Sequence, residues 1–463
     1  MTGTLVASPG FAMPAPVGTQ PPVAMKSIAA PVAGAVAGMP AAPASIGDRG
    51  CVRTVLSAMA AATIGRTGRA RRGRQGTHSD RASVTAMAAG QGSAPTLHVG
   101  IVGYGLVGKE LVGQILDNVA RLEAELGVRV EVSAVARSKT MVLLPTRGDA
   151  ALKGGAWPGG DVPLDLARLA DHVLAAAASS GGRAIMVDNT ASDAPPDHYA
   201  AWLAAGADVA TPNKRAGSGP YKRYEQIRTA AKQGGSRFLC EATVGAGLPI
   251  VGPLQSLLRA GDEVKTVEGI FSGTLSYIFN TWRPGMKFSD VVDDAKNKGF
   301  TEPDPRDDLS GTDVARKVTI LAREMGLKVE LDDVPVESLV PAALRDWTPP
   351  AGEKLGDAFV KALGDFDSDM DALISQADSA GKVLRFVGSV DVAAGTAAVK
   401  LGRFPKDHPF AGTQFADNIV AFDTKWYSPR PLVVQGPGAG AAVTAAGIFG
   451  NVLEVMNGMK RAQ

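Results

Sequence analysis

The chain has 463 residues, of which 45% are hydrophobic and 20% charged, and its formal net charge is +2. This length predicts two or three domains, and the composition is ordinary for a globular protein. No uninterrupted apolar run reaches the roughly 18 residues of a membrane-spanning helix, so we predict no membrane association. The two cysteines, Cys51 and Cys240, lie far apart and predict neither a disulfide framework nor a zinc site.

Positive charge is concentrated at the N-terminus. Residues 1–96 carry nine Lys and Arg against two Asp and no Glu, a charge of +7, which leaves −5 on the rest of the chain. An Arg-rich, Ser/Ala-rich and acid-poor terminus is typical of an organellar transit peptide. We therefore expect residues 1–90 to be a disordered transit peptide that directs the protein to the plastid (the chloroplast stroma). The run GRTGRARRGRQG is also compatible with a nucleic-acid-binding arm, but acid depletion and terminal position favour the transit peptide and no nucleic-acid partner.

A glycine-rich turn follows the first predicted strand. The segment LHVGIVGYGLVG, residues 97–108, is a short strand that runs into a GxGxxG turn, and an apolar helical pattern continues to about residue 126. This spacing lets the backbone approach a pyrophosphate at the N-terminus of a helix. We predict a dinucleotide-binding domain of the Rossmann type over residues 95–242, with cofactor contacts at Gly103, Gly105, Leu106, Val107 and Gly108. A glycine-rich turn that binds nothing is the alternative.

The end of the second predicted strand favours NADP(H). The strand over residues 128–136 ends at Arg137, where an NAD-specific enzyme usually carries Asp or Glu to hold the ribose 2′-hydroxyl. An arginine at this place accommodates a 2′-phosphate instead. We therefore predict NADP(H), with NAD(H) as the alternative cofactor, and a solvated basic loop is the other interpretation of Arg137.

Strands and helices continue to alternate along the chain. Helices are expected near residues 165–180 and 196–205, and apolar strands end before Thr190 and Lys214. This order predicts an α/β fold with a doubly wound parallel sheet, in which ligands lie beyond the carboxyl ends of the strands. Thr190 and Lys214 are therefore candidate ligand contacts, although Lys214 follows a TPN turn and is equally compatible with a surface lysine.

A second, α+β domain is expected over residues 243–435. We interpret Cys240, which precedes it among apolar strand residues, as a packing residue, because a reactive thiolate needs an exposed electropositive setting. The segment VEGIFSGTLSYIFN, residues 267–280, predicts a strand, a turn and a helix. Gly273 and Thr274 lie at the N-terminus of that helix, which is compatible with a site loop or with a plain helix cap.

Residues 301–321, TEPDPRDDLSGTDVARKVTIL, combine dense carboxylates with a lysine. The two prolines predict a rigid turn, and an apolar stripe then predicts a helix. Within that helix Ser310 and Asp313 resemble a capping box, and Lys317 lies at the i+4 position from Asp313, a surface pairing worth at most about 0.5 kcal/mol.

These structural roles leave the upstream acids Glu302, Asp304, Asp307 and Asp308 unexplained. Carboxylates concentrated at a turn repel one another unless they bind a cation, and the ammonium group of an amino-acid substrate would supply one. A lysine held by an aspartate could then donate or accept a proton at a reacting oxygen. We therefore interpret this segment as an active site.

Several long stretches resemble homoserine dehydrogenases. They occur in the family's order and extend over nearly all of the chain from about residue 97 to 463: ATPNKRA, EATVGAGLPI, EGIFSGTLSYIFN, GFTEPDPRDDLSGTDVARKVTIL, KDHPFA, DNIVAF and QGPGAGAAVTAAGIFGNVLEV. The resemblance implies reversible, NAD(P)-linked interconversion of L-aspartate 4-semialdehyde and L-homoserine, a step toward threonine, isoleucine and methionine.

The resemblance also implies roles for individual residues. Lys317 corresponds to the general acid/base and Asp313 to its partner, while Thr190 and Gly438 correspond to cofactor contacts and Lys214 lies near both substrate and nicotinamide. The residues that correspond to the substrate site are Glu302, Asp307, Asp308, Gly273, Thr274 and Tyr277. A monovalent cation, usually sodium, is implied at the segment that contains Glu241, Val244, Ala246 and Leu248.

The family precedent further implies a homodimer built through the second domain's sheet. Residues 436–463 are expected to return to the nucleotide-binding domain, where their glycines approach the cofactor and their apolar helix packs. His408 is interpreted as a loop histidine, with a role in tuning activity as the alternative. No aspartate kinase region precedes the glycine turn and no ACT domain follows it, so we expect a short, monofunctional form.

Two rival functions make different demands on the sequence. An acylating semialdehyde dehydrogenase would need a positioned catalytic cysteine, and Cys240 is the only one that remains after the predicted transit peptide. A non-catalytic NADP-binding regulator would be expected to lose Lys317 or Asp313, and both are present.

Overall fold

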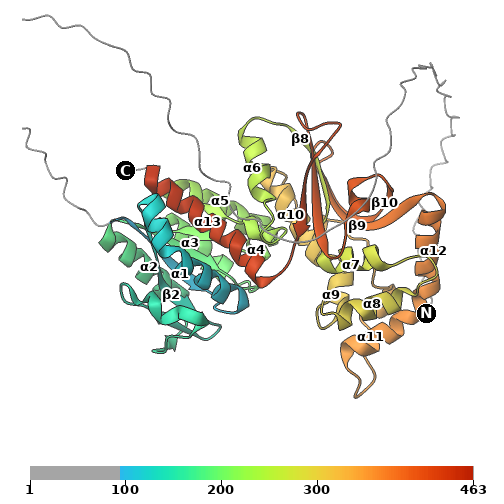
Figure 1. The fold of residues 1–463 in the computed structure, drawn as a ribbon, viewed down its shortest axis with the longest axis horizontal. Coiled ribbons are helices and arrows are strands. Elements are labelled where there is room, and N and C mark those ends of the chain that lie inside the picture. The colour runs from blue at the N-terminus through green and yellow to red at the C-terminus, as the bar shows by residue number, and fades with distance from the viewer. Residues whose placement is uncertain (1–93, 462–463) are drawn as a thin grey trace, which may run out of the picture. The chain divides into compact units, whose positions relative to one another are not determined.

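The computed structural model describes residues 94–461 (Figure 1). All described residues belong to one compact unit. The predicted transit peptide over residues 1–90 lies outside the described residues. None of the described helices is long and apolar enough to cross a membrane.

A seven-stranded sheet forms the first half of this unit. Its strand order is β4-β3-β2-β1-β5-β6-β7, and the strands β2, β1, β5, β6 and β7 are parallel. The parallel, doubly wound sheet predicted from the sequence is therefore confirmed. Two short antiparallel strands, β3 and β4, extend it beyond β2. The bounds are β1 Thr96–Val102, β2 Arg129–Ala136, β3 Thr140–Leu143, β4 Val162–Pro163, β5 Arg183–Asp188, β6 Asp208–Ala210 and β7 Phe238–Leu239.

Helices cover both faces of this sheet. On one face α1 packs with the C-terminal helix α13, and Leu111 and Ile115 of α1 share a buried cluster with Ile448 and Val452 of α13 (Figure 1). The other face is covered by α2, α3 and α5. The helices are α1 Leu106–Leu126, α2 Leu166–Ser180, α3 Tyr199–Ala204, α4 Lys214–Ser218, α5 Tyr221–Gly234 and α13 Ala441–Arg461, with 3₁₀ turns at η1 Gly148–Gly155, η2 Pro195–His198 and η3 Glu241–Thr243.

A five-stranded antiparallel sheet organises the second half, in the order β10-β9-β8-β11-β12. Its strands are β8 Val264–Ile270, β9 Lys382–Asp391, β10 Thr396–Pro405, β11 Asp417–Thr424 and β12 Leu432–Pro437. Its helices are α6 Val251–Arg259, α7 Gly273–Thr281, α8 Phe288–Asn297, α9 Pro305–Leu309, α10 Thr312–Glu324, α11 Leu355–Leu363 and α12 Asp367–Ser379, with 3₁₀ turns η4 Leu331–Asp333, η5 Ala342–Leu344, η6 Gly364–Phe366 and η7 Pro409–Gly412.

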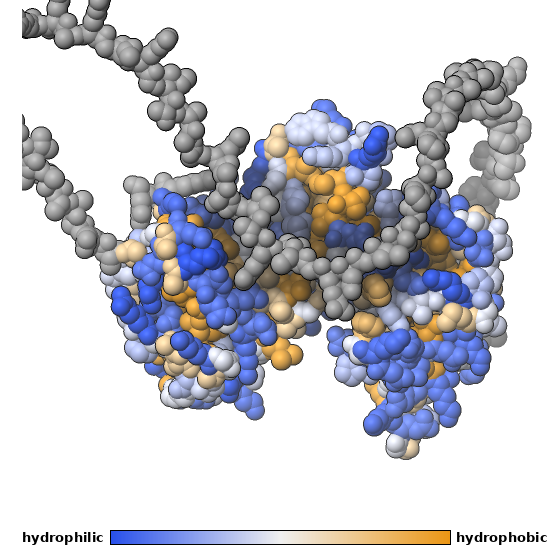
Figure 2. Space-filling view, viewed as in Figure 1, coloured by the Kyte–Doolittle hydropathy of each residue, from blue (hydrophilic) through white to orange (hydrophobic). Residues whose placement is uncertain are grey.

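Helix α10 lies at the centre of this second half. Val314, Val318 and Leu321 are at most 1% exposed and belong to a hydrophobic cluster that also includes residues of β9 and of α4. The helix therefore packs against elements from both halves of the chain, and its polar residues are held rigidly. Figure 2 shows that α8 and α11 present hydrophilic surface, whereas hydrophobic side chains gather over strands of the five-stranded sheet.

Candidate active site

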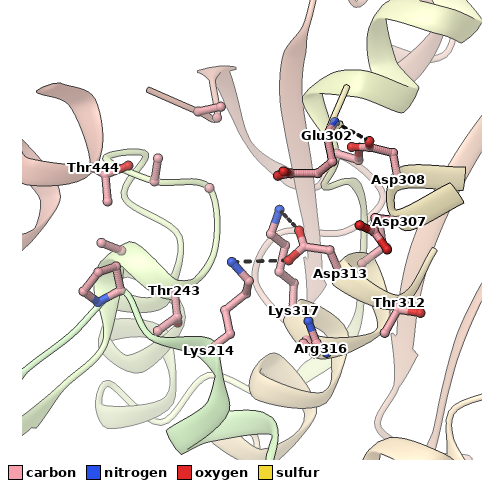
Figure 3. Close-up of a pocket in the computed structure, with 18 of the residues that line it drawn as sticks. Lys214, Thr243, Glu302, Asp307, Asp308, Thr312, Asp313, Arg316, Lys317 and Thr444 are labelled. Carbon is pink, nitrogen blue, oxygen red and sulfur yellow. Dashed lines mark hydrogen bonds and ion pairs between the residues drawn. The ribbon is translucent and has the colours of Figure 1, made fainter. Parts of the chain in front are cut away.

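A cavity of about 620 Å³ lies where the two sheets approach each other. It is bounded by the N-terminus of α4, the turn after β7, the segment that contains α9 and α10, and the glycine-rich turn before α13. It is lined by Lys214, Glu302, Asp307, Asp308, Asp313 and Lys317 (Figure 3). Gly438 lines it as well. Segments distant in sequence therefore meet at one polar cavity.

Lys317 projects from the second turn of α10 and is only 8% exposed. Its Nζ donates to the backbone oxygen of Phe271 at 2.6 Å and pairs with Asp313 Oδ2 at 2.9 Å. An ammonium group has three N–H donors, so one donor remains available toward the cavity. The sequence could not indicate the Phe271 contact, because this residue lies in a different element.

The predicted capping box at the start of α10 is wrong. Gly311, not Ser310, is the N-cap, and its φ of 75° is a left-handed conformation that favours glycine. A Cβ at this position would lie 2.8 Å from the ring of Phe386, so glycine is also required sterically. Asp313 is consequently free of any capping role, and its carboxylate faces the cavity.

Asp313 joins two lysines from different halves of the chain. Its Oδ1 lies 3.2 Å from Lys214 Nζ, and its Oδ2 pairs with Lys317 (Figure 3). Burial disfavours the charged form of Asp313, but the two ammonium groups outweigh it and hold the pKa of this carboxyl well below its usual range. Burial lowers the pKa of Lys214, and Asp313 opposes that shift.

A buried hydrogen-bond network fixes the position of Lys214. Lys214 is the first residue of α4, whose N-cap is Asn213. The Asn213 amide donates to Asp188 Oδ2 at 2.9 Å, and the Tyr199 hydroxyl donates to the same oxygen at 2.6 Å. Asp188 also accepts from the backbone N–H of Thr190 at 2.8 Å, so one carboxylate orients both Lys214 and the predicted cofactor contact Thr190.

The acidic segment is not a simple turn, which corrects the sequence prediction. Residues 305–309 form the short helix α9, because Pro305 suits the first helical position and Asp304 caps it by accepting from the N–H of Arg306 at 3.1 Å. This helix directs Asp308 toward the cavity.

Three of the acids gather above the lysines. Asp308 accepts from the Thr274 hydroxyl at 2.8 Å and from the N–H of Glu302 at 2.8 Å. Burial raises the pKa of Asp308, with the neighbouring charges of Glu302 and Asp307 adding to the effect. Figure 3 shows the Glu302 carboxylate pointing into the cavity near the amine of Lys317. The cavity therefore presents carboxylates on one side and lysines below.

The three predicted substrate contacts on α7 do not line the cavity. Thr274 reaches the site through Asp308, and Gly273 lies next to the cavity-lining Ser272, but neither lines the cavity itself. Tyr277 points elsewhere: its hydroxyl donates to Asp294, and its ring stacks on Phe300 with centroids 4.5 Å apart. Tyr277 therefore supports the packing of this region and does not contact the cavity.

The glycine-rich turn has the tight geometry that the sequence predicted. Gly103 has a φ of +88°, and a Cβ on Gly108 would lie 2.3 Å from the carbonyl oxygen of Gly103. Leu106 is 82% exposed, and a Cβ on Gly105 would also meet open space. Val107 packs at the edge of the α1 cluster. The turn thus leaves room for a ligand at the N-terminus of α1.

Asn189, which the sequence analysis did not single out, lies beside this turn. Both its amide nitrogen and its amide oxygen are buried, and neither has a hydrogen-bond partner among residues 94–461. The Asn189 amide nitrogen lies close to the glycine-rich turn, since a Cβ on Gly108 would be 3.3 Å from it. Orphaned polar atoms of this kind need a partner, so the site fits a bound cofactor that supplies one.

The segment with the predicted cation site has two distinct parts. The Glu241 carboxylate accepts hydrogen bonds from the N–H groups of Ile250, Val251 and Gly252 at 2.7–2.9 Å and so caps α6, while burial raises its pKa. By contrast, the carbonyl oxygens of Val244, Ala246 and Leu248 accept no hydrogen bond from any residue between 94 and 461. Free carbonyl oxygens suit a hard cation. No cluster of three or more His, Cys, Asp or Glu exists among the described residues.

Cys240 and His408 lie away from the lysines. Cys240 is 4% exposed, and burial raises the pKa of its thiol, so the structure agrees with a packing role. His408 accepts from the N–H of Phe410 at 3.2 Å as the cap of η7. Neither residue lines the cavity.

Other cavity residues were missed by the sequence analysis, among them Thr243, Ser272, Arg316 and Thr444. They are ordinary polar residues in helices or turns, and no local pattern distinguishes them. Asn418 was missed as well: it is fully buried and donates to the same Phe271 oxygen as Lys317, at 3.1 Å.

Comparison with known proteins matches two family models to this chain. Residues 249–453 match the family described as homoserine dehydrogenase, and residues 103–241 match the homoserine dehydrogenase NAD-binding domain. A homoserine dehydrogenase of Schizosaccharomyces pombe is 43% identical over 79% of this chain and 96% of its own length. A chloroplastic bifunctional aspartokinase/homoserine dehydrogenase of Zea mays is 46% identical over 78% of this chain, but the chain spans only 39% of that relative.

Solved structures share the same architecture. A protein of unknown function from Candida auris superposes with a TM-score of 0.70 at 38% identity, over 78% of this chain and 98% of that one. A hyperthermophilic archaeal homoserine dehydrogenase mutant in complex with NADPH has a TM-score of 0.57 over 78% of this chain and 97% of its own. At 20% identity it shows similarity of fold alone.

Proposed function

The chain belongs to the homoserine dehydrogenase family, and we propose that it catalyses the reversible NADPH-dependent reduction of L-aspartate 4-semialdehyde to L-homoserine. This reaction is a step in the biosynthesis of threonine, methionine and isoleucine. The observation that carries the proposal is the arrangement of Lys317, Asp313 and Lys214 below a group of carboxylates in one cavity. We assign residues 95–242 and 436–463 to cofactor binding and residues 243–435 to substrate binding and dimerisation.

In this proposal Lys317 is the general acid/base. Two of its donors are engaged by Phe271 and Asp313, so its amine is held in one place while the third donor faces the substrate. During reduction Lys317 donates a proton to the aldehyde oxygen as that oxygen gains negative charge, and during oxidation it accepts the proton of the hydroxyl. The reduced nicotinamide, when bound, supplies the hydride. Asp313 keeps both lysine amines oriented toward the cavity.

The carboxylates would hold the substrate's ammonium group. Glu302, Asp307 and Asp308 concentrate negative charge on one side of the cavity, and a cation relieves their mutual repulsion. Thr274 orients Asp308 by its hydrogen bond. This arrangement assigns amino-group recognition to the three acids and proton transfer to Lys317, in adjoining parts of the same cavity.

We assign the cofactor as NADP(H), with NAD(H) as the alternative. Gly103, Gly105, Leu106, Val107 and Gly108 would contact the pyrophosphate, while Thr190, Lys214 and Gly438 would face the nicotinamide end. The preference for NADP(H) rests on Arg137, which immediately follows β2 where an acidic residue would select NAD(H).

A sodium ion is a further part of the proposal. The free carbonyl oxygens of Val244, Ala246 and Leu248 offer it hard ligands, and Glu241 is the nearest acid in the sequence. Such an ion would stabilise the turn between β7 and α6, which contributes Gly245 and Ala246 to the cavity wall.

We also propose a homodimer and a plastid location. The hydrophobic surface over the five-stranded sheet (Figure 2) supports an association through that sheet. The acid-poor, arginine-rich N-terminal sequence supports import into the plastid.

Replacement of Lys317 tests the function directly. In Lys317→Ala, and in Lys317→Met, which keeps most of the buried side-chain volume, we expect turnover of homoserine to fall by about 10²–10⁴-fold or to be lost, while NADPH binding is retained. Lys265→Ala, which removes a half-exposed lysine on β8, is the matched control and should keep wild-type activity. Equal loss of turnover and NADPH binding in both Lys317 variants would mean that this lysine is structural.

A further inference from the structure

Arg137 lies against an aromatic ring at the edge of the nucleotide-binding sheet. Its guanidinium carbon is 3.8 Å from the centroid of the Trp157 ring. Among residues 94–461 no carboxylate pairs with Arg137, and no side-chain hydrogen bond of Arg137 is formed. Trp157 is therefore the group that orients this guanidinium.

Trp157 is itself fixed by several contacts. It follows η1 and packs at the edge of the cluster that contains α1, and its Nε1 donates to Asp161 Oδ1 at 2.8 Å. Its ring centroid lies 5.9 Å from that of Tyr104, which is 3% exposed and lies between Gly103 and Gly105. The ring is thus positioned between the glycine-rich turn and Arg137.

The backbone holds these parts together. The N–H groups of Gly103 and Tyr104 both donate to the carbonyl oxygen of Ala136, the last residue of β2, at 3.0 and 2.9 Å. Arg137 is the next residue, so the start of the glycine-rich turn and the arginine have a fixed spacing. A dinucleotide on that turn would direct its adenosine ribose toward the end of β2.

We propose that Trp157 is a specificity-determining positioning residue, which holds the Arg137 guanidinium by stacking so that it binds the ribose 2′-phosphate of NADP(H). This inference rests on the proposed function and deepens its cofactor assignment. Stacking uses the face of the guanidinium and leaves the N–H donors at its edge free for phosphate oxygens. A free arginine side chain would have to lose rotamer freedom on binding, whereas a stacked one has already lost most of it.

The test is equilibrium binding of NADPH and NADH by calorimetry, which does not depend on turnover. In Trp157→Ala we expect NADPH affinity to fall about fivefold, with NADH affinity unchanged within about twofold. Trp157→Phe keeps an aromatic face and should restore most of the NADPH affinity. Asp161→Asn weakens the hydrogen bond to Trp157 Nε1 but keeps the ring, so it should lower NADPH affinity less than Trp157→Ala or Trp157→Phe does.

A double-mutant comparison separates positioning from general loosening of the site. Arg137→Ala should lower NADPH affinity more than Trp157→Ala, and adding Trp157→Ala to Arg137→Ala should cause no further loss. Equal losses for NADPH and NADH in Trp157→Ala, or an undiminished Trp157 effect in the Arg137→Ala background, would overturn the inference.

The same binding data distinguish this inference from the proposed function. If Arg137→Ala leaves the NADPH:NADH affinity ratio unchanged, then the cofactor assignment and the Trp157 inference both fail, although homoserine turnover can persist. If the wild-type protein binds NADPH with the expected Trp157 dependence but does not oxidise homoserine, then the proposed reaction fails and the Trp157 inference stands.

Discussion

Replacing Asp313 by asparagine removes the charge that holds two lysine amines in the cavity. The carboxylate lies 2.9 Å from the amine of Lys317 and 3.2 Å from that of Lys214. The Asp313 carboxylate lies inside the cavity, but 44% of its side chain is exposed to solvent there, so a water-like dielectric is appropriate. With this dielectric, Coulomb's law gives an attraction of about 1.4 kcal/mol between Asp313 and Lys317 and about 1.3 kcal/mol between Asp313 and Lys214.

This energy predicts a shift in the pH profile. Asp313 opposes the lowering of the Lys214 pKa by burial, so loss of the carboxylate favours the neutral form of this amine and should move the alkaline limb of semialdehyde reduction to lower pH, by about one unit for about 1.3 kcal/mol. We expect kcat/KM near neutral pH to fall about 10²-fold, because the proton donor Lys317 loses the partner that orients its amine toward the substrate.

The assay is the pH dependence of kcat/KM for reduction, measured with saturating NADPH. Asp332→Asn, which removes an exposed carboxylate in η4, serves as the matched control and should leave the profile unchanged. The reasoning is refuted if Asp313→Asn keeps the wild-type alkaline limb and loses less than about threefold in kcat/KM, since the carboxylate would then not control the amines.

Three further outcomes follow from the geometry. Thr274→Val removes one hydrogen bond to Asp308 and should raise the KM for homoserine about fivefold with little change in the KM for NADP⁺; a comparable rise in both constants would contradict a role in amino-group recognition. The Cys240 thiol is buried and its pKa is raised, so mass spectrometry should find Cys240 unmodified after the native protein is treated with an alkylating agent at pH 8, and Cys240→Ser should retain activity. Alkylation of Cys240, or loss of activity in Cys240→Ser, would favour thiol chemistry. The pKa of Asp313 is lowered in the folded protein, so its stabilising contribution is present above about pH 4 and lost as pH falls; the difference in melting temperature between wild type and Asp313→Asn should shrink below pH 4, and a constant difference would argue against the ion pairs.

The local parts of the site could be predicted from the sequence. The GxGxxG turn, the helix over residues 106–126 and the i+4 pairing of Asp313 with Lys317 each depend on residues close in the chain, and the structure contains all three. Local patterns gave the wrong N-cap for α10, where the choice between Ser310 and Gly311 depends on backbone conformation. Gly311 was not recognised as the N-cap, because its left-handed conformation and its closeness to Phe386 both depend on how the chain turns between α9 and α10.

The long-range contacts could not be predicted. The pairing of Lys214 with Asp313 and the bond from Lys317 to the Phe271 carbonyl join segments that are far apart in sequence. Only the packing of α10 against both halves of the chain brings them together. The displacement of Tyr277 from the cavity has the same origin, since its orientation is set by Asp294 and by Phe300.

The most direct test of the central claim is formation of reduced cofactor by the purified protein with L-homoserine, with NADP⁺ and NAD⁺ supplied in parallel. The account predicts homoserine-dependent turnover that is faster with NADP⁺ and is lost in Lys317→Ala. Turnover that favours NAD⁺ would contradict the role of Arg137, and no turnover with either cofactor, in a protein that still binds NADPH, would contradict the assignment of the cavity as a homoserine dehydrogenase active site.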